Sequence, residues 1–207
     1  MLLVKNYING EKINYSSNTQ SIYNPSTGEI IGEVVLSNNN DLKEALETSL
    51  HSQIEWSKTT PLKRSRILSK YKNLIEKNIN ELAKIVSIEH GKTLDDAKAS
   101  ITRGLEVVEF ACGIPHMLKG DYSKNVGSDI DSWSFRDPIG VCAGITPFNF
   151  PAMVPMWMYP LAIACGNSFI LKPSEKNPSC SVRLAELFTE AGLPNGVLNV
   201  LHGDKNI

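Results

Sequence analysis

The feature that most limits the possible folds is an alternation of strand and helix patterns in the last third of the chain. Apolar runs typical of strands alternate there with helical patterns, at 139–145, about 152–165, 168–171, about 178–191 and 197–201. Strands joined by helices pair in parallel, because each helix carries the chain back to the edge from which the strand started. The sequence therefore predicts an α/β fold that contains a βαβαβ half of a doubly wound parallel sheet.

Two regions of different character come before this alternation. Residues 1 to about 37 are rich in turns, and an Asn9-Gly10 pair between short apolar runs is typical of a β-hairpin. Apolar residues recur at helical spacing from 39 to 119. The helix boundaries expected there are the capping residues Asn40 or Asp41, the first-turn residue Pro61, the C-cap Gly91 and a further start near Leu94. We expect an N-terminal β segment followed by a layer of packed helices.

The chain is thus divided into three parts. Residues 1–121 form the β segment and the helices, and residues 122–137 hold a strand whose alternation at 130–136 is broken by Asp137-Pro138. Residues 138–207 form the first half of the parallel sheet. A sheet that stops after three parallel strands is incomplete, because it leaves an edge that a whole doubly wound fold covers with further strands.

The balance of charges limits the partners. Of the 207 residues, 21 are Lys or Arg and 22 are Asp or Glu, so the chain lacks the basic surplus that draws a protein to nucleic acid or to an anionic membrane. The most hydrophobic stretch, 148–165, is interrupted by three prolines and suits a buried helix better than a membrane span. No basic segment precedes a long apolar run at the N-terminus, as it would in a secretory signal.

The cysteines and histidines indicate neither a disulfide framework nor a metal site. The four cysteines include no C-x-x-C pair, and the four histidines show no ligand spacing. All four thiols are expected in core positions. A reducing, cytoplasmic location is the natural expectation for such a chain.

A stiff loop follows the strand at 139–145, where open α/β sheets bind their ligands. It reads Pro-Phe-Asn-Phe-Pro at 147–151, so Asn149 lies between two aromatic residues in a loop that should be dry. The amide N–H groups of Asn149 could donate to charge that develops on a substrate oxygen. The alternative is an asparagine that only closes the turn.

The next strand end carries a second polar group. Lys172 and Glu175 lie three positions apart after the strand at 168–171, where they could grip a diol such as a ribose. The alternative is a solvated charge pair in an exposed loop. Two neighbouring strand ends with polar groups together favour a binding site.

Several motifs resemble the aldehyde dehydrogenase superfamily over the whole chain. They are NPSTG at 24–28, DPIGVCAGITPFNFP at 137–151, GNSFILKPSE at 166–175 and EAGLPNGVLNV at 190–200. Three further segments resemble its CoA-acylating, methylmalonate-semialdehyde dehydrogenase branch: RGLEVVEFA at 103–111, MVPMWMYP at 153–160 and LHGDK at 201–205. Phe148 stands where most members have Trp, and Lys176 where this branch commonly has Arg.

The resemblance implies an NAD-dependent oxidation of a small aldehyde with CoA as the co-substrate. It implies that Asn149 is the oxyanion donor and that Lys172 and Glu175 hold the adenosine ribose of NAD. The neighbouring cofactor positions are Thr146, Phe148 and Lys176. The segment 122–137 is similar to the family's oligomerisation arm, so the resemblance implies a homo-oligomer, a dimer or tetramer, in the full-length enzyme.

Arg103 is the expected ligand of the substrate carboxylate. Its apolar neighbours predict a buried guanidinium in need of a partner, and the matching residue of the branch is expected to bind the carboxylate of the semialdehyde. The alternative is a surface arginine paired with Glu106 or Glu109.

The nucleophilic cysteine of the family is not among the four present, since none lies in its motif. That cysteine and the catalytic domain belong to the second half of the usual chain, so these 207 residues alone should be inactive. Three hypotheses stay open: the N-terminal part of a CoA-acylating semialdehyde dehydrogenase, that of an ordinary non-acylating aldehyde dehydrogenase, and a truncated, non-catalytic fragment that only binds or assembles.

Overall fold

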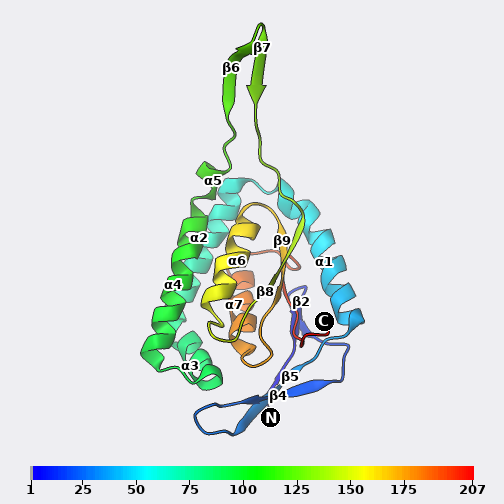
Figure 1. The fold of residues 1–207 in the computed structure, drawn as a ribbon, viewed down its shortest axis with the longest axis vertical. Coiled ribbons are helices and arrows are strands. Elements are labelled where there is room, and N and C mark those ends of the chain that lie inside the picture. Colours follow the sequence, from blue (N-terminus) through cyan, green and yellow to red (C-terminus); the bar gives the residue numbers. More distant parts are fainter. Residues whose placement is uncertain (1) are drawn as a thin grey trace.

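The computed structural model describes residues 2–207, and its central sheet has five strands (Figure 1). Their order is β3 (Glu11–Ile13), β2 (Asn6–Ile8), β10, β9 and β8. Residue 1, the first of the predicted β segment, lies outside the described residues. The strands β8 (Val141–Ile145), β9 (Ser168–Lys172) and β10 (Leu198–Val200) pair in parallel. Helices α6 (Met153–Ala164) and α7 (Ser179–Glu190) connect them. The predicted βαβαβ unit is confirmed.

Strand β9 is covered by helices on both faces. Phe169 and Leu171 belong to the large core shared with α6 and α7, whereas Ile170 packs in a smaller cluster with Ala45 of α1 (Asn39–Lys58). Successive side chains of a strand point to opposite faces, so one apolar run fills both layers. The sheet therefore lies between α1 and the pair α6–α7 (Figure 1).

The N-terminal hairpin closes one edge of this sheet. Strands β2 (Asn6–Ile8) and β3 (Glu11–Ile13) pair antiparallel, and Tyr7 of β2 lies opposite Val200 of β10. Asn9 and Gly10 have φ values of 54° and 79°, the conformation that a two-residue hairpin turn requires. The hairpin predicted from this pair is confirmed.

The opposite edge is the strand β8, which pairs only with β9 among the described residues. The run 139–145 was expected to be buried, but Ile139 and Ile145 are 87% and 76% exposed. The prediction of a buried strand is wrong for this chain, because a strand with one neighbour leaves half of its surface uncovered.

A second, three-stranded sheet lies at the end of the molecule that carries the N-terminus (Figure 1). It consists of β1 (Leu2–Val4), β4 (Thr19–Tyr23) and β5 (Ile30–Val35), with β5 in the middle. The turn-rich N-terminal segment thus divides its strands between two sheets.

The predicted helical layer is present as α2 (Pro61–Lys77), α3 (Ile79–His90), α4 (Leu94–Cys112) and the short α5 (Ile114–Met117). Pro61 begins α2 and Gly91, with a φ of 82°, ends α3, as expected. The cap of α1 is Asn38 rather than Asn40 or Asp41. Asp41 instead occupies the third position of a capping box, and its carboxylate accepts a hydrogen bond from the Asn38 N–H.

Helix α6 is held by side chains from the surrounding layer. The Trp56 Nε1–H and the Arg64 Nε–H donate to the carbonyls of Ile163 and Ala164, which lie in its last turn. A Cβ at Gly104 would lie 2.5 Å from the terminal methyl of Met156, so glycine lets α4 approach α6 closely. No helix of the described residues is long and apolar enough to cross a membrane.

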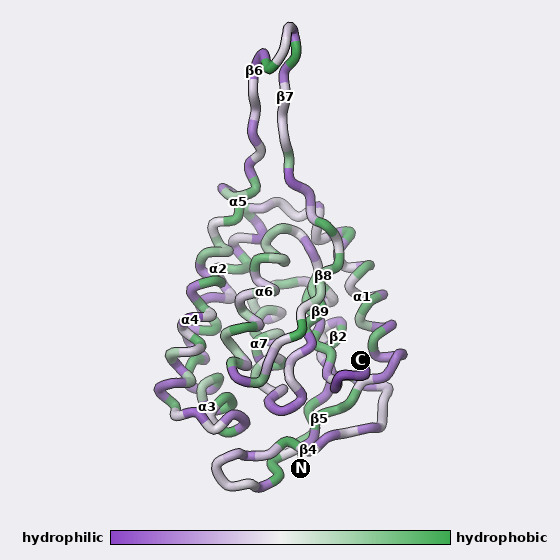
Figure 2. Tube along the Cα trace, viewed as in Figure 1, coloured by the Kyte–Doolittle hydropathy of each residue, from purple (hydrophilic) through white to green (hydrophobic). Residues whose placement is uncertain are grey.

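A two-stranded hairpin projects from the body of the molecule. It consists of β6 (Tyr122–Gly127) and β7 (Ile130–Trp133), and every residue of both strands is exposed (Figure 1). Figure 2 shows hydrophobic segments near its tip. The strand predicted within 130–136 is present, and β6 is its partner.

Candidate functional site

The loops after β8 and β9 meet at the carboxyl edge of the sheet. The Thr146 N–H donates to the Lys172 carbonyl at 3.1 Å, and Asn177 Nδ2 donates to the Phe148 carbonyl at 2.6 Å. These bonds hold together two loops that are about thirty residues apart in sequence. The polar groups predicted at two strand ends are therefore brought into one region.

Asn149 lies on the surface of this region. The prediction of a dry loop is wrong within the described residues, since Asn149 and Phe148 are exposed and Phe150 is half-buried. The reason is the place of β8 at the edge of the sheet, where no further described strand lies beside the loop. The bond from Asn177 to the Phe148 carbonyl anchors the loop, and the exposed side chain of Asn149 can meet a ligand.

Thr146 differs from its neighbours in the loop. It is only 4% exposed, and its hydroxyl oxygen has no hydrogen-bond partner in the described structure. Buried hydroxyl groups are normally paired, so an unpaired one beside a strand end is typical of a place where a ligand or water completes the hydrogen bonding.

Lys172 and Glu175 point toward each other. Their Nζ and Oε2 atoms are 3.7 Å apart, and the side chains are 15% and 26% exposed. Lys172 also donates to the Pro173 carbonyl at 3.2 Å. At 3.7 Å the contact is an ion pair longer than a good hydrogen bond, so both groups keep donors and acceptors for a diol.

Lys176 lies above the ring of Phe148. The Nζ atom is 4.7 Å from the ring centroid, within the range of a cation–π contact. Both residues are exposed and come from different loops. The Lys176 ammonium thus covers Phe148, whose ring offers an aromatic face but has no N–H group.

His202 is a residue that the sequence analysis missed. It follows β10, is fully buried, and both ring nitrogens lack partners in the described structure. Burial, and next the charge of Lys172, lower the pKa of His202 to about 3, so a neutral imidazole lies near the lysine. Its position in the sequence could have indicated it, because His202 follows the third parallel strand, beside the two strand ends already considered.

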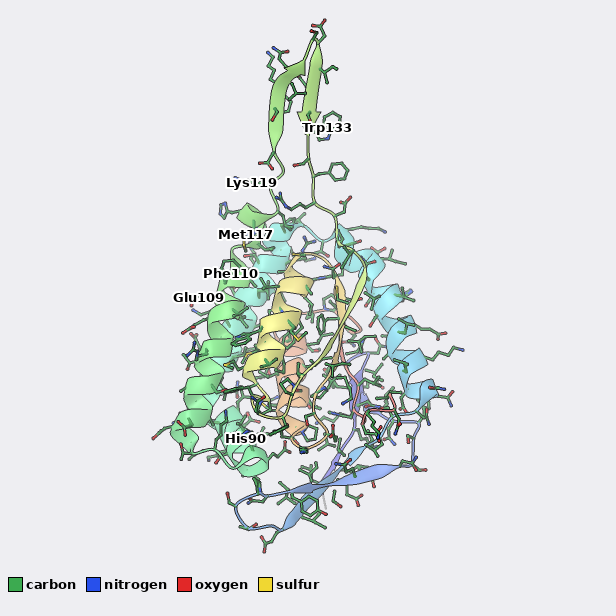
Figure 3. The ribbon with its side chains drawn as sticks, in the orientation of Figure 1. His90, Glu109, Phe110, Met117, Lys119 and Trp133 are labelled. Carbon is green, nitrogen blue, oxygen red and sulfur yellow. The ribbon has the colours of Figure 1, made fainter. Side chains whose placement is uncertain are left out.

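A cavity of about 440 Å³ adjoins this region. Phe148, Lys176 and Asn177 line one side, and Tyr23, Glu89 and other residues of the N-terminal sheet and α3 line the other. Glu89 is 7% exposed, and burial raises its pKa to about 7. Figure 3 labels the adjacent His90, whose pKa is lowered by burial and then by the charge of Lys92.

Arg103 is exposed, and the expectation of a buried guanidinium is wrong. It is exposed because its neighbours Gly104 and Leu105, rather than Arg103 itself, face the core. No ion pair joins it to Glu106 or Glu109 in the described structure, and Glu109 pairs with Lys72 instead. Arg103 lines a separate cavity of about 300 Å³ between α4 and the loop that contains Phe150.

The cysteines are not activated. Burial raises the pKa of the Cys112, Cys142 and Cys165 thiols, and Cys180 is fully buried in α7. The described residues contain no cluster of His, Cys, Asp and Glu that could hold a metal ion. The region can therefore bind and polarise a ligand, but it offers no thiolate nucleophile.

The chain is similar to proteins of known family over nearly all of its length. The model of the aldehyde dehydrogenase family matches residues 13–207. A malonate-semialdehyde dehydrogenase of Pseudomonas aeruginosa is 56% identical over 96% of this chain and 40% of that protein. One of Bacillus pumilus is 50% identical over 99% of this chain and 42% of that protein. The chain thus spans about two fifths of the length of these relatives.

Two solved structures have the same fold. A protein of Sinorhizobium meliloti, crystallised with NAD and described as a methylmalonate-semialdehyde dehydrogenase, is 51% identical with a TM-score of 0.97. The methylmalonate-semialdehyde dehydrogenase of Oceanimonas doudoroffii is 47% identical, also with a TM-score of 0.97. Each match covers 99% of this chain and 42% of the solved one.

Proposed function

Because the chain belongs to the aldehyde dehydrogenase family, we propose that it is the cofactor-holding part of an NAD-dependent semialdehyde dehydrogenase. The single observation that carries this proposal is the pairing of Lys172 with Glu175 at the carboxyl end of β9, beside the loop of Asn149. The substrates proposed are malonate semialdehyde and methylmalonate semialdehyde. They would be converted to acetyl-CoA and propionyl-CoA, with CoA as co-substrate, NAD as the oxidant that takes up the hydride, and the carboxyl group of the substrate released as CO2.

The residues fit a nicotinamide dinucleotide. Lys172 can donate to the ribose hydroxyls and Glu175 can accept from them. The unpaired Thr146 hydroxyl and the Phe148 face border the same loop, and Lys176 adds a cation for the phosphates. Bound NAD would supply the hydride acceptor.

Asn149 is proposed to stabilise the substrate oxygen. Its side-chain N–H groups are exposed at the strand end, where they can donate to an oxygen that becomes negative when a nucleophile adds to the aldehyde. The nucleophile itself is proposed to come from residues other than the four cysteines described above, whose pKa is raised by burial.

Arg103 is proposed to bind the carboxylate that distinguishes a semialdehyde from a simple aldehyde. Its exposure supports this role better than the burial expected from the sequence, because a free guanidinium can form two parallel hydrogen bonds to a carboxylate. Arg103 projects into a cavity that also contains Phe150, the neighbour of Asn149. A carboxylate held there keeps its substrate near the proposed oxyanion donor.

NAD binding tests the proposal directly. Lys172→Ala and Glu175→Ala should each weaken NAD binding by about 1.5–3 kcal/mol, measured by calorimetry on the same polypeptide. Glu106→Gln, on the exposed face of α4, is the matched control and should leave NAD affinity unchanged. Equal NAD affinities for all the variants would contradict the assignment.

The substrate is tested in a polypeptide that also carries the remaining family residues. Arg103→Leu should lower kcat/KM for malonate semialdehyde far more than for propanal, which has no carboxylate. Equal losses for the two aldehydes would make Arg103 structural. Omission of CoA distinguishes a CoA-acylating enzyme from an ordinary aldehyde dehydrogenase. Without CoA only the acylating enzyme should stop turning over, because its product is not released.

The arrangement of the molecule supports further proposals on domains, assembly and location. Residues 122–137 are proposed as an oligomerisation arm, because the exposed side chains of Trp133 and Phe135 lie outside any core. Such an arm would join copies of the chain in a homo-oligomer. Residues 1–121 and 138–207 are proposed as the two parts of the cofactor domain. Four free cysteines, none paired with another, support a cytoplasmic location.

A further inference from the structure

A small cavity between α4 and the β8–α6 loop carries more positive charge than the proposed role of Arg103 requires. It has a volume of about 300 Å³ and is lined by Lys92, Asp96, Ser100, Arg103, Phe150 and Met153. Two cations face one carboxylate, so the cavity has an excess of one positive charge. A cavity of this kind attracts a small anion.

The fold builds this cavity from two elements. Asp96, Ser100 and Arg103 lie on successive turns of one face of α4, at the three- and four-residue spacing that places side chains together. The close approach that Gly104 allows brings the start of α6 against this face, since a Cβ there would lie 3.1 Å from the Met153 Cα atom. Phe150 and Met153 thus form the opposite wall.

Lys92 enters the cavity from the turn that joins α3 to α4. Its backbone is fixed, because the Ser87 hydroxyl donates to the Lys92 carbonyl at 2.7 Å and Gly91 has the φ of 82° that ends α3. Its ammonium lies 4.0 Å from the centroid of the Phe150 ring. Burial lowers the pKa of Lys92 from its usual value, and Asp96 partly opposes that change. A partly dehydrated ammonium binds an incoming anion more strongly than a solvated one.

A second polar group in the wall has no partner. Ser100 is 7% exposed, and its hydroxyl oxygen forms no hydrogen bond in the described structure. A serine in a helix usually donates to the carbonyl four residues before it or to water. Its unused hydroxyl can instead donate to a ligand oxygen.

We infer that Lys92 is a second cation of the carboxylate subsite and, with the Ser100 hydroxyl, sets the preference for short carboxylated substrates. The inference rests on the proposed function, which assigns only Arg103 to the carboxylate. Without a ligand the Lys92 ammonium contacts the Phe150 ring. When a ligand binds, the ammonium contacts the ligand carboxylate, so Arg103 and Lys92 together neutralise the charge of that carboxylate. Phe150 holds the ammonium at the cavity and is next to Asn149.

The test uses the 207-residue chain and a stable probe, 3-hydroxypropanoate, which has one carboxylate and a hydroxyl in place of the aldehyde. The neutral comparison is 1,3-propanediol. Calorimetry should show that the chain binds 3-hydroxypropanoate more tightly than 1,3-propanediol. Lys92→Met should reduce this ratio of affinities, the preference for the carboxylate, about tenfold. Ser100→Ala should reduce it by a smaller factor. Lys98→Met, on a different face of α4, is the matched control and should change it less than twofold.

Proton NMR distinguishes a direct contact between Lys92 and the ligand from a weaker binding that any loss of positive charge would cause. The ε-methylene protons of Lys92 should be shifted upfield by the Phe150 ring, and Phe150→Leu should remove this shift. Addition of 3-hydroxypropanoate should move them downfield as the ammonium leaves the ring, whereas 1,3-propanediol should not.

The outcomes distinguish this inference from the proposed function. If Arg103→Leu abolishes the preference and Lys92→Met leaves it unchanged, the role of Lys92 is overturned while Arg103 keeps its assignment. If the wild-type chain shows no preference for the carboxylate, both assignments to this cavity are overturned. NAD binding through Lys172 and Glu175 is measured separately and does not depend on either result.

Discussion

The carboxylate of Glu89, near the end of α3, accepts a hydrogen bond of 3.1 Å from the backbone N–H of Ser179, the first residue of α7. Pro178 precedes that helix and provides no side-chain cap. Glu89 therefore supplies from another helix the acceptor that a capping residue usually provides, at the positive end of the α7 dipole. This contact joins the outer helical layer to the helix that follows the Lys172 loop.

The stability of the chain should fall between about pH 5 and pH 8 because of Glu89. Burial raises its pKa to about 7 from the ordinary 4.5 of a glutamate, so the folded state holds a proton that the unfolded state has released. The stabilising contribution is complete below pH 4.5 and is lost as the pH rises through 7. The loss is at most about 3 kcal/mol, measured as the free energy of unfolding in urea.

Glu89→Gln keeps the acceptor for Ser179 but cannot ionise, so it should remove this dependence on pH. Glu106→Gln, at an exposed position of α4, should retain it. A Glu89→Gln chain that loses as much stability as the wild type over this range would show that another group is responsible.

Single and double substitutions of two core tyrosines should give unequal losses. The hydroxyl oxygens of Tyr71 and Tyr159 are 2.5 Å apart in the fully buried core. Tyr159→Phe alone leaves the Tyr71 hydroxyl without its partner and should cost about 1–3 kcal/mol. The double change Tyr71→Phe with Tyr159→Phe should cost less than the sum of the single changes. Urea unfolding measures both, with exposed Tyr15→Phe as a neutral control.

Self-association should depend on the projecting hairpin. Trp133 and Phe135 are 71% and 72% exposed, and Figure 3 shows Trp133 at the side of the hairpin and Phe110 on the outer face of α4. Large exposed aromatic side chains are common anchors of protein interfaces. Trp133→Ser with Phe135→Ser should weaken association about tenfold or more in sedimentation velocity. Ile54→Ser, at a position on α1 that is 53% exposed, should have no effect.

A polypeptide of these 207 residues alone should form no NADH from propanal, NAD and CoA. Asn149 can stabilise an oxygen only after a nucleophile has added to the aldehyde, and burial raises the pKa of the Cys142 and Cys165 thiols away from the thiolate form. Absorbance of NADH measures the result. Turnover that survives purification and disappears on Cys142→Ser or Cys165→Ser would identify a nucleophile within this chain.

The sequence predicted the elements that local rules control. Gly91 ends α3, Pro61 begins α2 and Asn9-Gly10 turns the first hairpin, because each depends on the φ of a single residue. The parallel order of β8, β9 and β10 followed from the helices between them. These features need no knowledge of distant parts of the chain.

The errors concern burial, which depends on neighbours that are distant in sequence. Apolar residues around Arg103 suggested a buried arginine, but the helix turns it outward while Gly104 faces α6. The run at β8 was apolar enough for a central strand, yet it has a single neighbour. Lys92 and Ser100 were not singled out, because only the packing of α6 on α4 makes them parts of one cavity.

The pairing of the first hairpin with β10 also sets an order of events during synthesis. Tyr7 lies opposite Val200, and the side-chain oxygen of Asn6 accepts from the His202 N–H at 2.7 Å. At about 5–20 residues per second, a ribosome needs on the order of ten seconds or more to make the residues between them. Until then β2 and β3 have no sheet to join. The hairpin is translated well before the strand that it pairs with, so the emerging chain must keep an unpaired strand edge from other polypeptides throughout that interval.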